Sequence, residues 1–273
     1  MHRILIILSE YGYWGEELVG PLAEFDKAGY EIDFATPRGQ RPSPLPPSMD
    51  AAFIDPPLGK SVVSEDVAQK TRDLDASSRY DHPIDISGWI PERPYWSSPT
   101  MLRDMESYYA SLDALEQELQ KYAAILLVGG SGPIVDIANN DRVHALILTF
   151  LKLGKPIGAE CYGVTALAFA RDLADRKSII WGKHVTGHCK EYDYKDGTGF
   201  LGTDLNMGPP PYPLEYILRD ATGPDGAYHG NLGHATSVIV DYPFITGRST
   251  PDSYLTGQKM VEVLDSGLTR YGW

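Results

Sequence analysis

The sequence predicts an α/β protein with a mostly parallel sheet that is covered by helices on both faces. Three observations indicate this class: short apolar runs with the length of strands, amphipathic helical segments that alternate with them, and glycine-containing turns between the two. Strands that alternate with helices are joined by crossover connections, so they are expected to lie parallel and to be buried on both faces. The expected architecture is a three-layer sandwich with helices on each side of the sheet.

The N-terminal segment predicts a βαβ unit. Residues 3–8 form a continuous apolar run, and residues 30–35 alternate between apolar and charged side chains. Between them, residues 16–28 predict an amphipathic helix that ends at Gly29.

Regular periodicity is missing from residues 37–100, which contain eleven prolines together with Trp89, Tyr95 and Trp96. A long irregular segment inside a compact domain is typical of functional loops or of disorder. Within a single domain of residues 1–273, we therefore expect a cap insertion at about 42–99 that places Trp96 against the substrate. The alternatives are a loop that only stabilises the sheet and an interface between copies of the chain.

The remaining residues return to the alternating pattern of strands and helices. The segments expected to be helical are 100–122, 141–153, a helix after Cys161, and 254–264. The expected strands are 123–128, 157–160, 178–180, 184–186 and 237–240.

Composition limits the classes of partner. A net charge of −13 argues against binding to nucleic acids and to anionic membranes, and no apolar run reaches the length of a membrane span. Two cysteines are too few for a disulfide framework and suit a reducing compartment. We expect a soluble, cytoplasmic protein whose partner is a small-molecule substrate.

Cys161 is the strongest candidate for a catalytic residue. A short strand leads into it, a glycine follows two residues later, and an alanine-rich helix begins there. This is the strand–turn–helix pattern of a nucleophile elbow, with Cys in place of Ser. The helix N-terminus is expected to lower the pKa of the thiol. The alternative is a buried structural cysteine.

Two further elements should meet Cys161 at the carboxyl edge of the sheet. Gly129 and Gly130 follow a strand directly, and their backbone N–H groups are suited to an oxyanion; their spacing does not match a nucleotide-binding loop. Glu16 and Glu17 begin the first helix. One of them is expected to complement the helix dipole, and the other to donate a hydrogen bond to the sulfur when protonated.

Among seven histidines, His188 is the best candidate for the general base, because it follows a strand and has an acid, Glu191, three residues later. His229 and His234, which flank a glycine-rich loop, remain alternatives. A metal site is not expected, because the histidines and Cys189 lack the spacing of metal ligands.

Several motifs together make the chain resemble the ThiJ/PfpI superfamily of class I glutamine amidotransferase-like proteins, nearest the branch with glyoxalase III and heat-inducible chaperone activity. The resemblance covers nearly the whole chain except much of 45–120. The segments that carry it are Gly12–Glu17 with Pro21, Ala28–Pro37, Gly129–Gly132, Cys161, Gly182–Gly187, Pro213–Glu215, Val240–Arg248 and Ser253.

The resemblance implies a flavodoxin-like fold and a role for each matching residue. It makes Cys161 the nucleophile, Glu17 the acid that bonds to the sulfur, and Gly129 and Gly130 the oxyanion loop. Glu191 falls near the acid that supports the catalytic histidine. The family's histidine after the nucleophile is replaced by Tyr162, which we expect to donate a hydrogen bond to a substrate oxygen or nitrogen.

Two classes of function are compatible with these residues. The first is a cofactor-free, cysteine-dependent enzyme that acts on a small electrophilic substrate. By resemblance it would convert a 2-oxoaldehyde to a 2-hydroxy acid, or act as a related hydrolase or hydratase. The second is a non-enzymatic stress protein, either a chaperone or a cysteine redox sensor. The resemblance also implies a homodimer. The long cap favours an enzyme with a lidded pocket.

Overall fold

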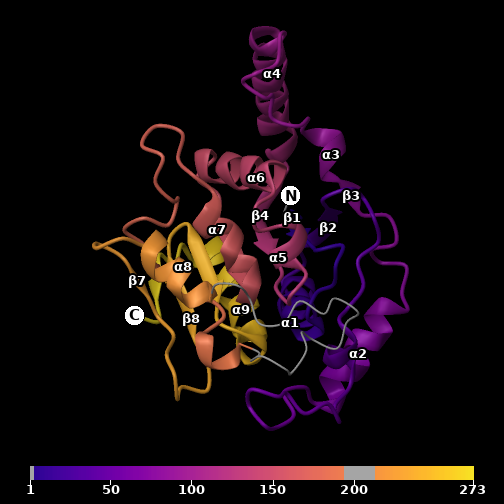
Figure 1. The fold of residues 1–273 in the computed structure, drawn as a ribbon. Helices are drawn as coiled ribbons and strands as arrows, with labels where there is room; N and C mark the ends of the chain where they lie inside the picture. The colour runs from indigo at the N-terminus through magenta and orange to yellow at the C-terminus, as the bar shows by residue number, and fades with distance from the viewer. Residues whose placement is uncertain (1–2, 194–212) are drawn as a thin grey trace.

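An eight-stranded sheet runs through the centre of the molecule in the computed structural model, which describes residues 3–193 and 213–273 (Figure 1). The strand order is β10-β8-β9-β5-β4-β1-β2-β3. Within this order, the six neighbouring strands β9-β5-β4-β1-β2-β3 pair in parallel. At the other edge, β8 pairs antiparallel with β9, and β10 pairs antiparallel with β8. The three-layer α/β architecture expected from the sequence is therefore confirmed.

The strands of the central sheet are β1 (Arg3–Ile7), β2 (Glu31–Thr36), β3 (Ile84–Asp85), β4 (Tyr122–Leu127), β5 (Ile157–Glu160), β8 (Val238–Asp241), β9 (Phe244–Gly247) and β10 (Arg270–Tyr271). A separate parallel pair is formed by β6 (His184–Val185) and β7 (Ala227–Tyr228). The helices are α1 (Gly15–Lys27), α2 (Glu65–Asp75), α3 (Ile86–Trp89), α4 (Met101–Leu119), α5 (Pro133–Asp136), α6 (Asp141–Lys152), α7 (Thr165–Phe169), α8 (Leu214–Ala221) and α9 (Ser253–Ser266). Short 3-10 turns are η1 (Pro46–Met49), η2 (Cys161–Val164), η3 (Lys190–Tyr192) and η4 (Thr250–Asp252).

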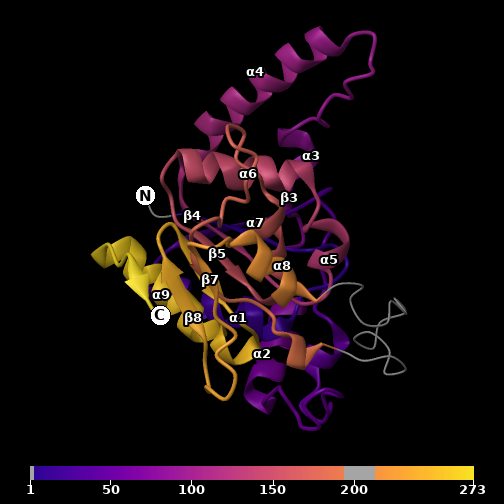
Figure 2. The same cartoon turned by 60° about the vertical axis from the view of Figure 1, so that its left-hand side comes forward.

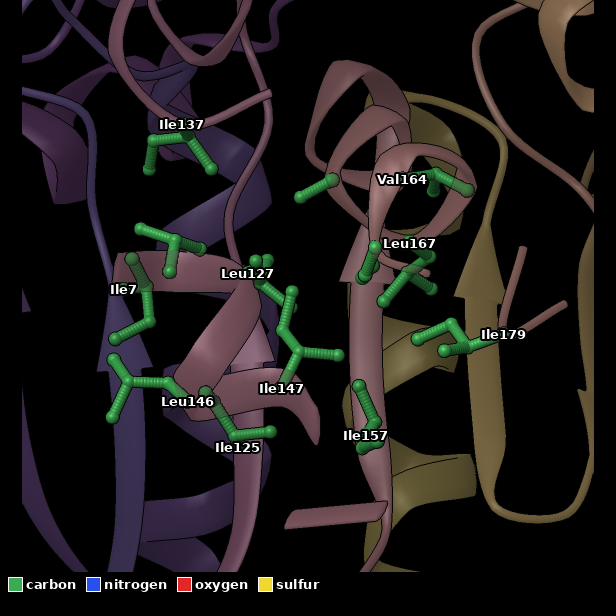
Figure 3. Close-up of a cluster of buried hydrophobic side chains, with 14 of the residues drawn as sticks. Ile7, Ile125, Leu127, Ile137, Leu146, Ile147, Ile157, Val164, Leu167 and Ile179 are labelled. Atoms are coloured by element: carbon green, nitrogen blue, oxygen red, sulfur yellow. The ribbon is translucent and has the colours of Figure 1, made fainter. Parts of the chain in front are cut away.

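Alternate residues of the strands face two separate hydrophobic cores. On β1, Ile4 and Ile6 join the core under α1 and α9, whereas Leu5 and Ile7 join the core under α6 and α7. Figure 3 shows part of the second core, in which Leu146 of α6 lies against the central strands. A strand in the middle of such a sheet has no polar face, which explains why β1 is apolar at every position after Arg3.

Two helix ends show the local chemistry that fixes them. Asn140 caps α6, because its side-chain oxygen accepts hydrogen bonds from the backbone N–H groups of Arg142 and Val143, at 3.0 and 3.3 Å. α9 is terminated by Gly267, the residue after Ser266, whose φ of 70° lies in the left-handed region that glycine adopts without strain.

The segment expected to be an irregular cap contains a regular helix, α2. Ser64 caps this helix by accepting a hydrogen bond from the N–H of Val67 at 3.2 Å, and two acids occupy its first turn. With Trp14 and Leu45, α2 builds a small third core beside the sheet. The cap side of the molecule is therefore a packed structure.

Two other expectations for secondary structure need correction. Residues 178–180 do not form a strand, because Ser178 makes only an isolated bridge with Arg171 before the chain turns. The helix expected at 100–122 ends at Leu119, and its first half extends away from the body of the molecule (Figures 1 and 2). Its buried residues are Tyr108, Leu115 and Leu119.

Candidate active site

Cys161 lies at the carboxyl end of β5, at the start of the turn that leads through η2 into α7. Its φ is 54°, in the left-handed region that residues with a side chain seldom adopt. Such strained conformations persist where the surrounding structure enforces them, and they cluster at functional sites. The side chain is buried but lines a cavity. The local geometry is therefore that of a nucleophile elbow.

Glu17 is the acid that reaches the sulfur. It is buried on the first turn of α1, and its carboxyl group is hydrogen-bonded to Cys161. Burial raises the pKa of Glu17 to about 8, so the carboxyl group is mostly protonated at neutral pH and donates to the sulfur. Glu16 points elsewhere and accepts a hydrogen bond from the Thr250 hydroxyl at 2.6 Å.

The pKa of the Cys161 thiol is raised well above its ordinary value, and the sequence-based expectation of a lowered pKa is wrong. Burial of the sulfur is the largest cause, and the negative charge of an ionised Glu17 adds to it. The N–H of Gly130 opposes the shift without reversing it. The helix that begins here, α7, has only five residues and so offers a weak dipole. Cys161 therefore rests as a thiol and needs a base.

His188 is the candidate for that base. Its Nδ1 lies 3.5 Å from the sulfur of Cys161. Its Nε2 lies 3.1 Å from Oδ1 of Asp193, within ion-pair distance but not aligned for a hydrogen bond. A proton held on Nε2 next to the carboxylate leaves the lone pair of Nδ1 free to accept the thiol proton. The three residues thus form a Cys–His–Asp arrangement of the kind that activates cysteine nucleophiles.

The acid that supports His188 is Asp193, not Glu191 as the sequence suggested. Glu191 lies within the 3-10 turn η3 and is exposed, whereas Asp193 follows that turn and is buried. A 3-10 helix has about three residues per turn, so η3 reverses the direction of the chain between the histidine and the acids. Asp193, five positions after His188, therefore lies against the imidazole ring, and Glu191, three positions after it, does not.

The hydroxyl of Tyr162 is not directed at a substrate, which corrects the role expected for it. It donates a 2.6 Å hydrogen bond to Oδ1 of Asp193, the same oxygen that faces His188. The Tyr162 ring also stacks on the His188 ring, with centroids 4.2 Å apart and planes 25° apart. Tyr162 therefore holds both members of the histidine–aspartate pair, although its side chain also lines the cavity.

The glycine loop after β4 passes directly over the sulfur. Gly130 has a φ of 88°, and a Cβ atom there would lie 2.5 Å from the backbone nitrogen of Trp14. A Cβ atom on Gly129 would lie 2.3 Å from Oε2 of Glu17 and 2.6 Å from Cβ of Cys161. Only glycine fits either position. The N–H of Gly130 is hydrogen-bonded to the sulfur and is placed to stabilise an oxyanion formed there.

These groups share a cavity of about 770 Å³. Part of the expected cap, residues 58–64 together with Asp55, forms one wall. Arg248, Ser249 and His234 contribute to the lining from the C-terminal part of the chain. Arg248 was not among the site residues expected from the sequence, although an arginine directly after an apolar strand indicates a position at the carboxyl edge of the sheet.

Trp96 does not reach this cavity, so the role expected for it is wrong. It is 83% exposed, and Tyr95 is 75% exposed, in the segment between α3 and α4. Neither residue lines the cavity. Prolines and aromatic residues marked this part of the chain as irregular, but they did not indicate which part of it would fold over the site.

Two features are absent from residues 3–193 and 213–273. No group of three or more His, Cys, Asp or Glu side chains there is arranged to hold a metal ion. No helix in that part of the chain is long and apolar enough to cross a membrane.

Comparison with known proteins gives a family match. Residues 8–185, more than half of the chain, match the model of the ThiJ/PfpI family-like proteins. A bovine (Bos taurus) glutamine amidotransferase-like class 1 domain-containing protein 1 is 27% identical over 154 residues, which are 56% of this chain and 64% of that protein. An uncharacterised protein of Archaeoglobus fulgidus is 31% identical over 64 residues, 23% of this chain and 38% of that protein. The chain thus spans less than two thirds of the length of these relatives.

Solved structures share the fold over nearly the whole length. Glyoxalase III of Candida albicans has a TM-score of 0.66 at 17% identity, with 97% of this chain and 98% of that chain covered. The rapid encystment protein of Francisella tularensis has a TM-score of 0.66 at 20% identity, with 97% and 99% covered. At such identities the likeness concerns the fold alone.

Proposed function

The chain belongs to the ThiJ/PfpI-like family, and on that premise we propose that it is a cofactor-free enzyme in which Cys161 attacks a small electrophilic substrate. The observation that carries the proposal is the position of Nδ1 of His188, 3.5 Å from a buried thiol, with Asp193 behind the ring. A histidine nitrogen beside a protonated thiol is in the position to accept the thiol proton during a reaction, which is the role of a general base.

The first step is addition to a carbonyl carbon. The Cys161 proton passes to His188 as the sulfur bonds to the substrate, and the carbonyl oxygen becomes an oxyanion. The N–H of Gly130 stabilises that charge, and protonated Glu17 adds no negative charge beside it.

The reaction that we favour converts a 2-oxoaldehyde to a 2-hydroxy acid, because a structural neighbour is a glyoxalase III. His188 returns its proton to the oxyanion, which completes the hemithioacetal at the aldehyde carbon. The neutral ring then accepts the C–H proton of that carbon, and an enediol forms. Protonation at the neighbouring carbon gives a thioester, and water then releases the acid and the thiol. The aldehyde carbon is oxidised as the ketone carbon is reduced, so no external oxidant is needed. A hydrolase or hydratase would use the same adduct.

A redox sensor receives less support than an enzyme. Sulfenic acid formation needs an accessible thiolate, whereas the Cys161 side chain is only 5% exposed and its thiol pKa is raised. The chaperone alternative remains a prediction. The homodimer implied by the family resemblance also remains a prediction, and sedimentation would measure the oligomeric state directly.

The test is turnover of phenylglyoxal and methylglyoxal, with the 2-hydroxy acid measured by chiral chromatography. Cys161→Ala should abolish product formation. Cys189→Ala, which removes the other buried cysteine, is the matched control and should retain it. Product formation by Cys161→Ala at the wild-type rate would refute the proposal.

A further inference from the structure

Building on the proposed function, we propose that the substrate carries a carboxylate, which is bound by Arg248 and Ser249 in the lining of the cavity, with Lys60 as a further cation in the same lining. The described residues leave two buried donors of this lining unpaired. Both Nε of Arg248 and the hydroxyl of Ser249 are buried without a hydrogen-bond acceptor, and both residues line the cavity. A buried donor without an acceptor is costly unless a ligand supplies one.

Arg248 is held rigidly by the groups around it. It is 1% exposed, and its two terminal nitrogens donate to the backbone carbonyls of Gly230, Asn231 and His234, at 2.7 to 3.1 Å. Asp252 offsets its charge, but its nearest carboxylate oxygen lies 3.7 Å from Nε, which is too far for a hydrogen bond. The guanidinium is therefore preorganised, with one N–H left over.

Ser249 is the residue next to Arg248, so the two free donors come from adjacent positions on the wall. The backbone N–H of Ser249 is already used by Asp252, at 2.9 Å, which fixes the backbone of Ser249. Two neighbouring donors match the two oxygens of a carboxylate. A neutral carbonyl oxygen has the lone pairs to accept from both donors, but it brings no negative charge to the guanidinium.

Lys60 adds a cation at the wall formed by the cap. It is exposed, lines the same cavity, and makes no side-chain hydrogen bond or ion pair with another described residue. The two acids in this lining are Asp55, which accepts a hydrogen bond from the N–H of Leu58 at 3.0 Å, and Glu17, which is mostly protonated. In a chain of net charge −13, a cavity with a free cation and free donors favours an anionic ligand.

The size of the cavity agrees with this class of substrate. About 770 Å³ lies in the range that accommodates drug-sized ligands and far exceeds what a three-carbon aldehyde fills. Trp14 and Tyr192 supply apolar surface in the lining. We therefore expect a molecule with an electrophilic carbon at one end, an apolar body, and a carboxylate at the other end.

The first experiment compares two alkylating agents of similar size, anionic iodoacetate and neutral iodoacetamide. Their rates at Cys161 are measured by peptide mass spectrometry at one pH. Both need the same thiolate, so its fraction cancels in the ratio of the two rates. The rate with iodoacetate divided by the rate with iodoacetamide should be higher for Cys161 than for 2-mercaptoethanol. Lys60→Gln should lower this ratio by about threefold. The control Lys27→Gln alters a lysine that is 77% exposed on α1 and should leave the ratio unchanged.

The second experiment does not depend on reactivity at Cys161. Thermal stabilisation is measured with phenylacetate and with phenylacetamide, which differ chiefly in charge. Phenylacetate should raise Tm by about 2 °C more than phenylacetamide at millimolar concentration, and Ser249→Ala should remove the difference.

The outcomes separate the two proposals. A ratio of alkylation rates that is insensitive to Lys60→Gln, or equal stabilisation by the acid and the amide, would overturn the carboxylate site. If the charge preference is found but Cys161→Ala keeps full turnover, the carboxylate site stands and the proposed function fails.

Discussion

Replacing Glu17 with glutamine should change how the stability of the protein depends on pH. In the folded protein the pKa of Glu17 is about 8, against an ordinary value of 4.5. Between these two pH values the folded state holds a proton that the unfolded state has released. Because the folded state binds more protons there, the free energy of unfolding falls as pH rises from about 4.5 to about 8.

The magnitude follows from the size of the shift. One fully shifted carboxyl group changes the free energy of unfolding by about 1.4 kcal/mol per pH unit, so the whole window amounts to a few kcal/mol. This is a large share of the roughly 5–15 kcal/mol that stabilises a typical domain. Glutamine keeps the shape and the hydrogen-bond donor but cannot ionise. Glu17→Gln should therefore resemble the wild type near pH 5 and be more stable than it near pH 8.

The assay is urea unfolding at four pH values between 5 and 8, in a reducing agent, with wild type and variant compared at each pH. Glu24→Gln on the same helix is the control, because the carboxylate of Glu24 forms an ion pair with Lys27 at 3.6 Å. It should keep the wild-type slope. Parallel curves for wild type and Glu17→Gln would refute a protonated Glu17 beside the sulfur.

Three further substitutions test other parts of the site. Tyr162→Phe removes the hydrogen bond to Asp193 and should lower kcat by about tenfold with little change in KM, because the lost contact is with the aspartate; a raised KM at constant kcat would show instead that the hydroxyl binds substrate. Gly130→Ala places a Cβ atom 2.5 Å from the backbone nitrogen of Trp14 and should cost a few kcal/mol of stability, measured by urea unfolding; an unchanged midpoint would contradict the geometry of the loop. Trp96→Ala should leave kcat/KM unchanged, because Trp96 lies outside the cavity; a loss of activity without dissociation would restore the role first expected for it.

Local patterns in the sequence were enough to predict the fold and the centre of the site. Cys161 follows directly from the strand that carries it, and Glu17 is separated from β1 by a short connection, so neighbouring residues fix both positions. The apolar run of β1 required burial on both faces, which only a central strand provides.

The parts that sequence reasoning missed depend on contacts between distant segments. Choosing Asp193 over Glu191 needed knowledge of the 3-10 turn between His188 and the acid, which residue types alone do not specify. The raised pKa of Cys161 reflects burial of the sulfur in the folded structure and the negative charge of an ionised Glu17, neither of which can be read from the residues around Cys161. Arg248 acquires its role from carbonyl groups about 14 to 18 residues earlier in the chain.

The residues around the Cys161 sulfur and the residues that line the rest of the cavity come from different parts of the fold. The nucleophile, its acid and the oxyanion loop follow β5, β1 and β4, three adjacent parallel strands at the centre of the sheet. Part of the cavity lining comes instead from the connection between η1 and α2, which lies outside the sheet. Under the proposed function, exchanging residues 55–64 for those of a relative should change the compound that is bound while Cys161 keeps its position. A lineage that varies this short connection would then acquire new substrates with the same nucleophile.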